Sequence, residues 1–313
     1  VNFSGKVQVF FSTLKVAALG AIIGITLTSF STGNFGNFTD PLWPETFGWQ
    51  TILGVGAALR YSFFAFSGWE GATYVAEEVK NPKRTLPLSL FLGIGGVMVL
   101  YLGANMGYLF QLDAEALVEN KWVATAAMRV VLGASGGILI SIAVAINAFG
   151  NISTQILCKG RTWHAMARDG LFFKSFAKLH PKYGTPNNAL IGQGFWASIL
   201  LILAVTSTYL QSGSTGTNAY EMVIDFFSAT STIFNILVFA SIMVLRKKWP
   251  NKDRPYKALL YPWSMYIVVL LNGAFLLLTL ITAFIPSMIG IMLTATGGIY
   301  YYFVIHRRGL LNS

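Results

Sequence analysis

Long uncharged apolar stretches alternate with short charged segments along this chain of 313 residues. Six stretches of 20 residues or more hold no charged side chain, and about 20 apolar residues let a helix cross a bilayer. The stretch from Ala258 to Ile305 is too long for one such helix, and Pro286 predicts a break within it. The pattern predicts an all-α polytopic membrane protein, a single transmembrane domain over residues 1–313. Its eight spans are expected at 7–30, 50–79, 85–110, 136–158, 187–207, 219–246, 257–283 and 286–305.

The charges between the spans indicate how the chain threads through the membrane. If Val1 lies in the cytoplasm, 18 of the 22 basic residues fall in cytoplasmic segments, and only Lys121 and Arg129 fall in outer loops. This asymmetry follows the positive-inside rule, and removing any span would destroy it, so the span at 50–79 crosses despite its charges, with Arg60 and Glu70 inside it. We therefore expect a multi-pass protein of the plasma (inner) membrane, with the basic loops and both chain ends in the cytoplasm.

Two connecting segments carry patterns of their own. Residues 114–132 have the spacing of a short helix that folds back over the outer face. Residues 160–182 are basic, with interleaved aromatic residues: Trp163, Phe172, Phe173 and Phe176. Such a segment is typical of an interfacial amphipathic stretch on an anionic inner leaflet. A connector held at the membrane surface is a simpler interpretation of it than a binding site for a partner protein.

The composition excludes several classes of protein. Hydrophobic residues make up 54% of the chain and charged residues 11%, whereas soluble domains carry about a quarter charged residues. Cys158 is the only cysteine, which excludes an intrachain disulfide framework. The net charge of +10 is spread over separate loops of one leaflet, which argues against nucleic-acid binding. The sequence has no phosphate-binding glycine loop, no metal-ligand spacing of histidines and no histidine within the spans, so we expect no enzyme activity, cofactor or metal.

The most informative stretch lies in the second span, from Phe63 to Gly71. It places glycine, serine and the acid Glu70 where a continuous apolar helix would be most stable. A helix break at membrane depth is tolerated only where the freed backbone groups line a cavity or are buried in protein. Its two helix ends suit a zwitterion such as an amino acid, with amide donors for the carboxylate and carbonyls for the ammonium. The alternative is an unbroken helix in which Gly68 and Gly71 form a close contact with another helix.

Other polar side chains within the spans are candidates because ionisable groups in hydrocarbon are costly. Lys15 lies eight residues into the first span, where it either has a function or snorkels to the interface. Arg60 faces either a water-filled vestibule or an outer gate, and Asp225 lies near enough to the outer end of its span to be solvated. Uncharged polar residues in the fourth and sixth spans favour a shared polar cavity over separate helix contacts. They are Asn147, Asn151, Ser153, Thr154 and Gln155, and Ser228, Thr230, Ser231, Thr232 and Asn235.

Four motifs resemble those of amino acid permeases of the amino acid–polyamine–organocation superfamily. Phe64-Ala65-Phe66-Ser67-Gly68-Trp69-Glu70, followed by Ala76 to Pro87, resembles the signature of the family's sixth helix. The segment from Lys6 to Lys15 resembles the fifth helix with its buried lysine. Residues 165–170 with 184–186 resemble the loop between helices eight and nine, and residues 246–248 with 254–257 resemble the loop after helix ten. The resemblance covers essentially the whole chain and is nearest to bacterial relatives of the L-type exchangers.

The resemblance implies a LeuT-type fold of inverted repeats, with the eight spans as helices five to twelve and a broken helix at 64–71. By the same resemblance, substrate binds at Phe64 to Glu70. The backbone of residues 65–68 would hold the amino group, Phe64 would gate the site, and Trp69 and Glu70 would shape it or couple it to protons. Lys15 resembles a lysine that replaces a sodium ion, with Asn147 and Asn151 beside it. The implied function is sodium-independent secondary transport of amino acids, by exchange or proton coupling, through alternating access.

The chain departs from the family pattern in two places. Asn147-Ala148-Phe149-Gly150 stands where a Ser/Thr-Phe-Gly pattern is commoner, which leaves the transported amino acid open. Nothing in the chain resembles the family's first four helices, so we expect them to precede Val1 or to come from a second chain. The other expected partners are a small amino acid and the lipid bilayer. If those helices are absent altogether, the alternative is a non-transporting membrane scaffold or partner subunit that keeps the permease fold.

Overall fold

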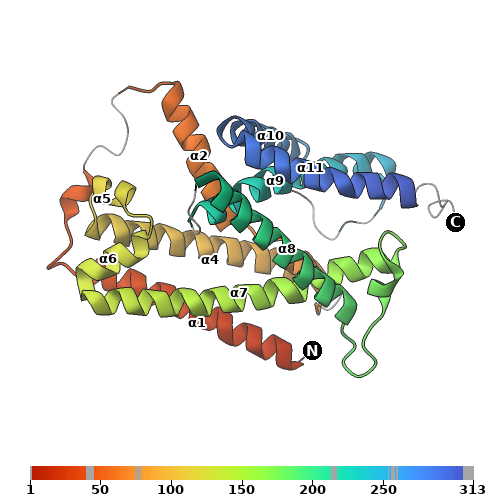
Figure 1. Ribbon diagram of the computed structural model, residues 1–313, viewed down its shortest axis with the longest axis horizontal. Helices are drawn as coiled ribbons and strands as arrows, with labels where there is room; N and C mark the ends of the chain where they lie inside the picture. Colours follow the sequence, from red (N-terminus) through yellow and green to blue (C-terminus); the bar gives the residue numbers. More distant parts are fainter. Residues whose placement is uncertain are drawn as a thin grey trace. The chain divides into compact units, whose positions relative to one another are not determined.

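The helices of the chain follow the apolar stretches of its sequence. A computed structural model describes residues 2–39, 46–74, 76, 79–212, 217–252, 254, 258 and 260–305, which hold helices and turns but no strand (Figure 1). The α-helices are α1 (Asn2–Thr28), α2 (Trp49–Ala65), α3 (Gly71–Tyr74), α4 (Pro82–Gln111), α5 (Ala114–Glu119), α6 (Val123–Leu132), α7 (Ala134–Arg168), α8 (Asn187–Ser212), α9 (Thr217–Lys248), α10 (Trp263–Thr282) and α11 (Phe284–Tyr300). Two 3-10 helices, η1 (Phe35–Phe38) and η3 (Lys174–Ala177), and the π-helical η4 (Tyr301–Ile305) complete these elements.

Seven helices in the described part of the chain are long and apolar enough to cross a membrane: α1, α4, α7, α8, α9, α10 and α11. Their surfaces carry many large exposed apolar side chains, such as Phe91, Val99 and Leu270, which are 70% to 78% exposed. Apolar surface on this scale is disfavoured in water and matches the hydrocarbon of a bilayer. The protein is therefore an all-α polytopic membrane protein, as the sequence predicts.

The predicted span at 50–79 differs from the other seven because its helix is interrupted. α2 ends at Ala65 after 17 residues, residues 66–70 form turns, and α3 begins at Gly71. A helix of this length spans about 26 Å, less than the roughly 30 Å of a hydrocarbon core. The interruption expected at 64–71 is present, and it occupies residues 66–70.

Three further boundaries differ from those predicted. The span at 136–158 belongs to α7, which continues to Arg168, so the predicted interfacial stretch 160–182 begins as helix. The outer segment 114–132 holds two helices, α5 and α6, rather than one. The last two spans separate at Ala283 (φ −139°, ψ 56°), while Pro286 lies in the first turn of α11, where its missing N–H removes no helical bond. Residues 77–78, 255–257 and 306–313, which carry parts of the predicted motifs and the last basic residues, lie outside the described residues.

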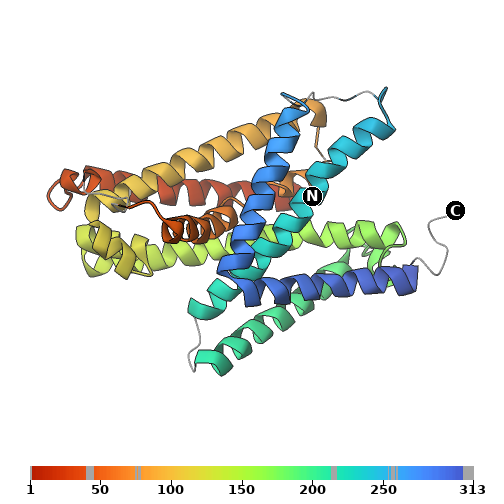
Figure 2. The ribbon, with the colours of Figure 1, turned by 90° about the horizontal axis from the view of Figure 1, so that it is seen from above.

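The chain folds as two compact parts. The first comprises Val1–Thr46, Gly71–Val79 and Thr85–Lys159, and it contains α1 and most of α4 and α7. In Figure 2 these three helices run alongside one another. The second part comprises Phe47–Glu70, Lys80–Arg84 and Gly160–Ser313, and it contains α2 and α8 to α11.

In the first part, glycines on α4 let α1 approach closely. Gly103 faces Ile23, and Gly107, four residues later on the same helix face, meets Thr26. Gln111 lies one further turn along this face, where its buried amide nitrogen donates to the carbonyl oxygen of Thr26 at 2.6 Å. The close contact at these glycines and the hydrogen bond from Gln111 to Thr26 therefore hold α1 against α4.

In the second part, α9 is the central helix, packing against α2, α8, α10 and α11. Gly290 of α11 permits close approach, because a Cβ added there would lie 2.7 Å from the hydroxyl oxygen of Thr230. Ser228 and Thr232 of α9 are fully buried, and the Thr232 hydroxyl donates to the carbonyl oxygen of Ser228 at 2.6 Å. These two polar residues are therefore part of the helix packing, whereas the sequence favoured a polar cavity for them.

Replacing Gly107 with leucine should destabilise the first part, because the new side chain would collide with Thr26 and force α1 away from α4. Overpacking of a close contact costs about 1–3 kcal/mol, which we expect to appear as a lower temperature of thermal unfolding in detergent. Gly96→Leu on the same helix is the control, because a Cβ added there meets nothing within 4 Å. Equal unfolding temperatures for the two variants would contradict the close contact between α1 and α4.

Candidate functional site

The interruption between α2 and α3 depends on the backbone conformation of Gly68. Its φ of +98° lies in the left-handed region, which residues with a side chain disfavour. Just before it, the N–H of Phe66 donates to the carbonyl of Ser62, and the N–H of Ser67 donates to the carbonyl of Phe64, both at 3.0 Å. The helix therefore tightens in its last turn and ends at Ala65, and the chain takes a left-handed conformation at Gly68 within the turns that follow.

Two side chains take part in the hydrogen bonding of the interruption. The hydroxyl of Ser67 donates to the carbonyl oxygen of Phe64 at 2.6 Å. The backbone N–H of Gly68 donates to Oε2 of Glu70 at 3.0 Å. Glu70 is half-buried. Its carboxylate provides a hydrogen-bond partner for a backbone N–H that has no helical partner where the helix is interrupted. This acid has a structural role in the interruption, whatever else it does.

Aromatic contacts attach both ends of the interruption to α9. The ring of Phe64 meets that of Phe227 edge to face, with centroids 5.6 Å apart. The ring of Trp69 stacks on Phe239, with centroids 6.5 Å apart and planes inclined by 11°. Between these anchors, residues 65–68 are exposed. The residues predicted to bind substrate therefore form one segment whose ends are packed and whose middle is accessible.

An ion pair also joins α2 to α9, a little over one turn before the interruption. Nη1 of Arg60 lies 2.5 Å from Oδ1 of Asp225, and the two side chains are only 9% and 15% exposed. The expectation that Asp225 is solvated was wrong, and Arg60 is paired. A basic and an acidic residue within separate predicted spans were the sequence signal for this contact, since a buried charge requires a partner.

The first part of the chain holds the other candidate residues. Nζ of Lys15 donates to Oδ1 of Asn151 at 2.6 Å, which links α1 to α7. The lysine chain passes over Gly150, where an added Cβ would lie 2.9 Å from Cε and 3.2 Å from Nζ of Lys15. The amine is therefore held by α7. Asn147 lies one turn before Asn151 and is exposed, and among the described residues its side chain makes no hydrogen bond.

Two more contacts extend this interface between α1 and α7, and sequence reasoning missed both. The hydroxyl of Thr154 donates to Oε1 of Gln8 at 2.8 Å, and the rings of Phe11 and Phe149 lie 5.6 Å apart. Residues 8, 11 and 15 share one face of α1, so their helical spacing was the signal that could have identified this face.

The candidate residues thus form two groups, one in each compact part. Phe64 to Glu70 offer backbone polar groups, aromatic walls and one carboxylate, while Lys15, Asn147 and Asn151 offer an ammonium group and two amides. The described residues contain no group of three or more histidine, cysteine or acidic side chains that could hold a metal ion. Each group by itself offers polar partners of the kind that a charged or zwitterionic solute requires.

Comparison with known proteins identifies similar chains. The model of the amino acid permease family matches residues 1–306. The human cystine/glutamate transporter is 26% identical over 306 residues, covering 97% of this chain and 57% of the transporter. The mouse large neutral amino acids transporter small subunit 2 is 29% identical over 304 residues (96% and 54%), and the rat b(0,+)-type amino acid transporter 1 is 26% identical over 311 residues (98% and 59%). The chain spans somewhat over half the length of these curated relatives.

Substituting alanine for Gly68 should destabilise the interruption by about 1–2 kcal/mol, because the new Cβ disfavours the positive φ. Gly71→Ala is a matched control. A Cβ added at either glycine meets nothing within 4 Å, but Gly71 is the first residue of α3 and has no positive φ. Thermal unfolding of both variants provides the measurement. A control variant as destabilised as Gly68→Ala would indicate that φ at residue 68 is not the cause.

The pair of Arg60 and Asp225 should behave as a coupled unit. Removing one partner of a buried ion pair costs about 3–5 kcal/mol, because the other charge is left uncompensated. We expect Arg60→Gln and Asp225→Asn each to lower the unfolding temperature, and the double variant to lose clearly less than the sum of both. Additive losses in this double-mutant cycle would contradict a direct interaction.

Proposed function

The chain belongs to the amino acid permease family, and from this membership we propose that it performs sodium-independent secondary transport of amino acids across the plasma membrane. The observation that best supports this proposal is the interrupted helix at residues 66–70. An interruption at membrane depth is stable only where its backbone groups find partners other than lipid. A bound zwitterion supplies such partners, and it would do so reversibly.

In this proposal the substrate is a small α-amino acid, in keeping with the names of the relatives. Its ammonium group lies against backbone carbonyls of residues 65–68, which are accessible, and its side chain lies near Phe64 and Trp69. Both rings pack against α9, so in this proposal they form walls of the site, with Phe64 also acting as the gate that the family resemblance implies. Substrate size would then be limited by the spacing of these two anchors.

Lys15 substitutes for a coupling cation in the proposed mechanism. Its ammonium group is bonded to Asn151 and so holds a fixed positive charge between α1 and α7, where a sodium ion would otherwise be required. Asn147, one turn away, is a further polar partner along the same helix. A transporter with such a built-in charge works by exchange, or by coupling to protons.

Glu70 is the proposed link between protons and the interruption. Its carboxylate accepts the backbone N–H of Gly68, and a charged acceptor makes a stronger hydrogen bond than a neutral acid. Protonation would therefore weaken the bond that shapes the turn and change the geometry offered to substrate. Alternating access follows if α2 and α3 then move as two separate pieces about residues 66–70.

The test is amino acid exchange by the full-length protein in liposomes with potassium salts on both sides. We expect labelled substrate to exchange without sodium, and Lys15→Met to slow this exchange at least about tenfold, which corresponds to roughly 1.4 kcal/mol. Lys6→Met is the matched control, an exposed lysine on the same helix, and should exchange at the unmodified rate. The unfolding temperature of Lys15→Met should change little.

Three outcomes would count against the proposal. Exchange that strictly requires sodium would remove the role given to Lys15. Parallel loss of exchange and of folding in Lys15→Met would make that lysine structural. A complete lack of flux in the unmodified full-length protein, across cystine, glutamate and large neutral amino acids, would favour the alternative of a non-transporting subunit.

A further inference from the structure

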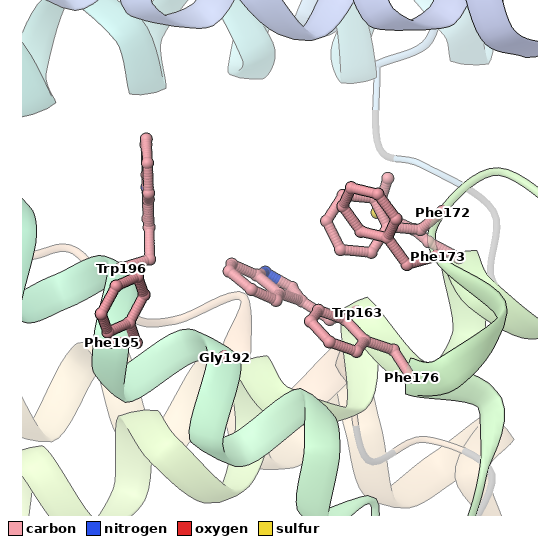
Figure 3. A pocket seen from close by; sticks show the side chains of 8 residues that line it. Trp163, Phe172, Phe173, Phe176, Gly192, Phe195 and Trp196 are labelled. Carbon is pink, nitrogen blue, oxygen red and sulfur yellow. The ribbon is translucent and has the colours of Figure 1, made fainter.

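The second part of the chain contains an apolar cavity of about 500 Å³ that plays no part in the proposed transport site (Figure 3). Cavities that hold small molecules measure about 300–1,000 Å³, so this one is large enough for a ligand. Six of its eight lining residues are phenylalanine or tryptophan, and the other two are a methionine and a glycine. Walls of this kind suit hydrocarbon.

Two helix faces and a loop build the cavity. Trp163 and Met166 lie three residues apart on one face of α7, and Phe195 and Trp196 lie on the face of α8 that carries Gly192. The loop between the two helices adds three phenylalanines, at positions 172, 173 and 176. In Figure 3, the side chains from α8 and those from the loop stand on opposite sides, with Trp163 between them.

Hydrogen bonds fix this loop against both helices, so the cavity is preformed. Nδ1 of His164 on α7 lies 3.0 Å from the carbonyl oxygen of Phe176, which accepts its hydrogen. The amide nitrogen of Asn188 on α8 donates to the carbonyl oxygen of Ser175 at 2.9 Å. The ring of Phe176 also stacks on Trp163, with centroids 5.8 Å apart. A preformed site binds without first ordering its walls.

The loop that lines one side of this cavity carries exposed positive charge. In sequence, Lys174 lies between the lining residues Phe173 and Phe176, and Lys178 follows four residues later. Both lysines are exposed. Asp169 is the only acidic residue from Lys159 to Tyr220, and it lies 3.9 Å from Arg168. The loop therefore presents uncompensated lysines beside a hydrocarbon-lined cavity. An amphiphile with an apolar chain and an anionic head complements both features.

We propose that this cavity binds one acyl chain of an anionic phospholipid, whose phosphate group lies against Lys174 and Lys178. The cavity is formed by membrane-spanning helices at the end that carries a basic loop, so phospholipid is the amphiphile in contact with it. Basic residues near a membrane surface attract anionic lipids in particular. A neutral lipid would fill the cavity but gain nothing from the lysines. The lipid site is independent of the proposed transport activity.

Quenching of tryptophan fluorescence by brominated lipids tests this proposal in the full-length protein. The chain has 8 tryptophans, and the two in the cavity are isolated by subtracting the signal of the Trp163→Phe/Trp196→Phe double variant. Vesicles contain phosphatidylglycerol and phosphatidylcholine, with bromine on the acyl chains of one or the other. We expect the cavity tryptophans to be quenched at a mole fraction of brominated phosphatidylglycerol at least about tenfold below that needed for brominated phosphatidylcholine.

Substitutions of the loop lysines distinguish the contribution of the lipid head group from that of the acyl chain. Lys174→Gln and Lys178→Gln should each reduce the preference for phosphatidylglycerol about fivefold, the effect of one basic residue near an anionic surface. Lys83→Gln, at the start of α4, is the matched control and should leave the preference unchanged. Gly192→Leu would place a side chain in the cavity and should abolish quenching there by both lipids. Circular dichroism and thermal unfolding confirm that each variant folds.

Two results would overturn the proposal. Equal quenching of the cavity tryptophans by both brominated lipids at every mole fraction would mean that the cavity does not select an anionic lipid. If neither lipid quenched them while the remaining tryptophans were quenched, another segment of the full-length protein or a second copy would fill the cavity.

Discussion

A backbone in hydrocarbon must find a hydrogen-bond partner for nearly every N–H and C=O group, and this requirement organises the whole chain. Continuous helices meet it in the seven long spans. α2 stops at Ala65, and there short-range bonds take over: Ser67 bonds back to Phe64, and Glu70 accepts the N–H of Gly68. The interruption is thus a built feature, stabilised by its own side chains and by aromatic contacts with α9.

Polar side chains also form pairs that join helices. The buried ion pair of Arg60 with Asp225, the exposed bond of Lys15 to Asn151 and the bond of Thr154 to Gln8 each join two helices. Each pair also fixes the rotation of one helix against the other. The family resemblance assigns some of these residues to transport, and the same residues also hold helices together. Binding or proton transfer at these residues would therefore affect helix packing.

The sequence predicted the features that depend on composition along the chain and missed those that depend on contacts between helices. Seven spans and the interruption near Gly68 follow from apolar length and from residues unfit for a helix in lipid. The pairing of Lys15 with Asn151 was anticipated only through the family resemblance. The role of Asp225, the room made by Gly150 and the burial of Ser228 depend on how helices are rotated, which hydropathy does not encode. Helix ends such as Arg168 were also missed, because α7 continues past the apolar region into a basic segment.

The central claim is that the interruption at residues 66–70 binds the substrate, and a structure of the full-length protein with an amino acid bound tests it most directly. We predict a ligand whose ammonium nitrogen lies about 3 Å from carbonyl oxygens of residues 65–68, with Gly68 still at positive φ. A ligand bound elsewhere, or a helix that runs without a break from α2 into α3, would contradict the account.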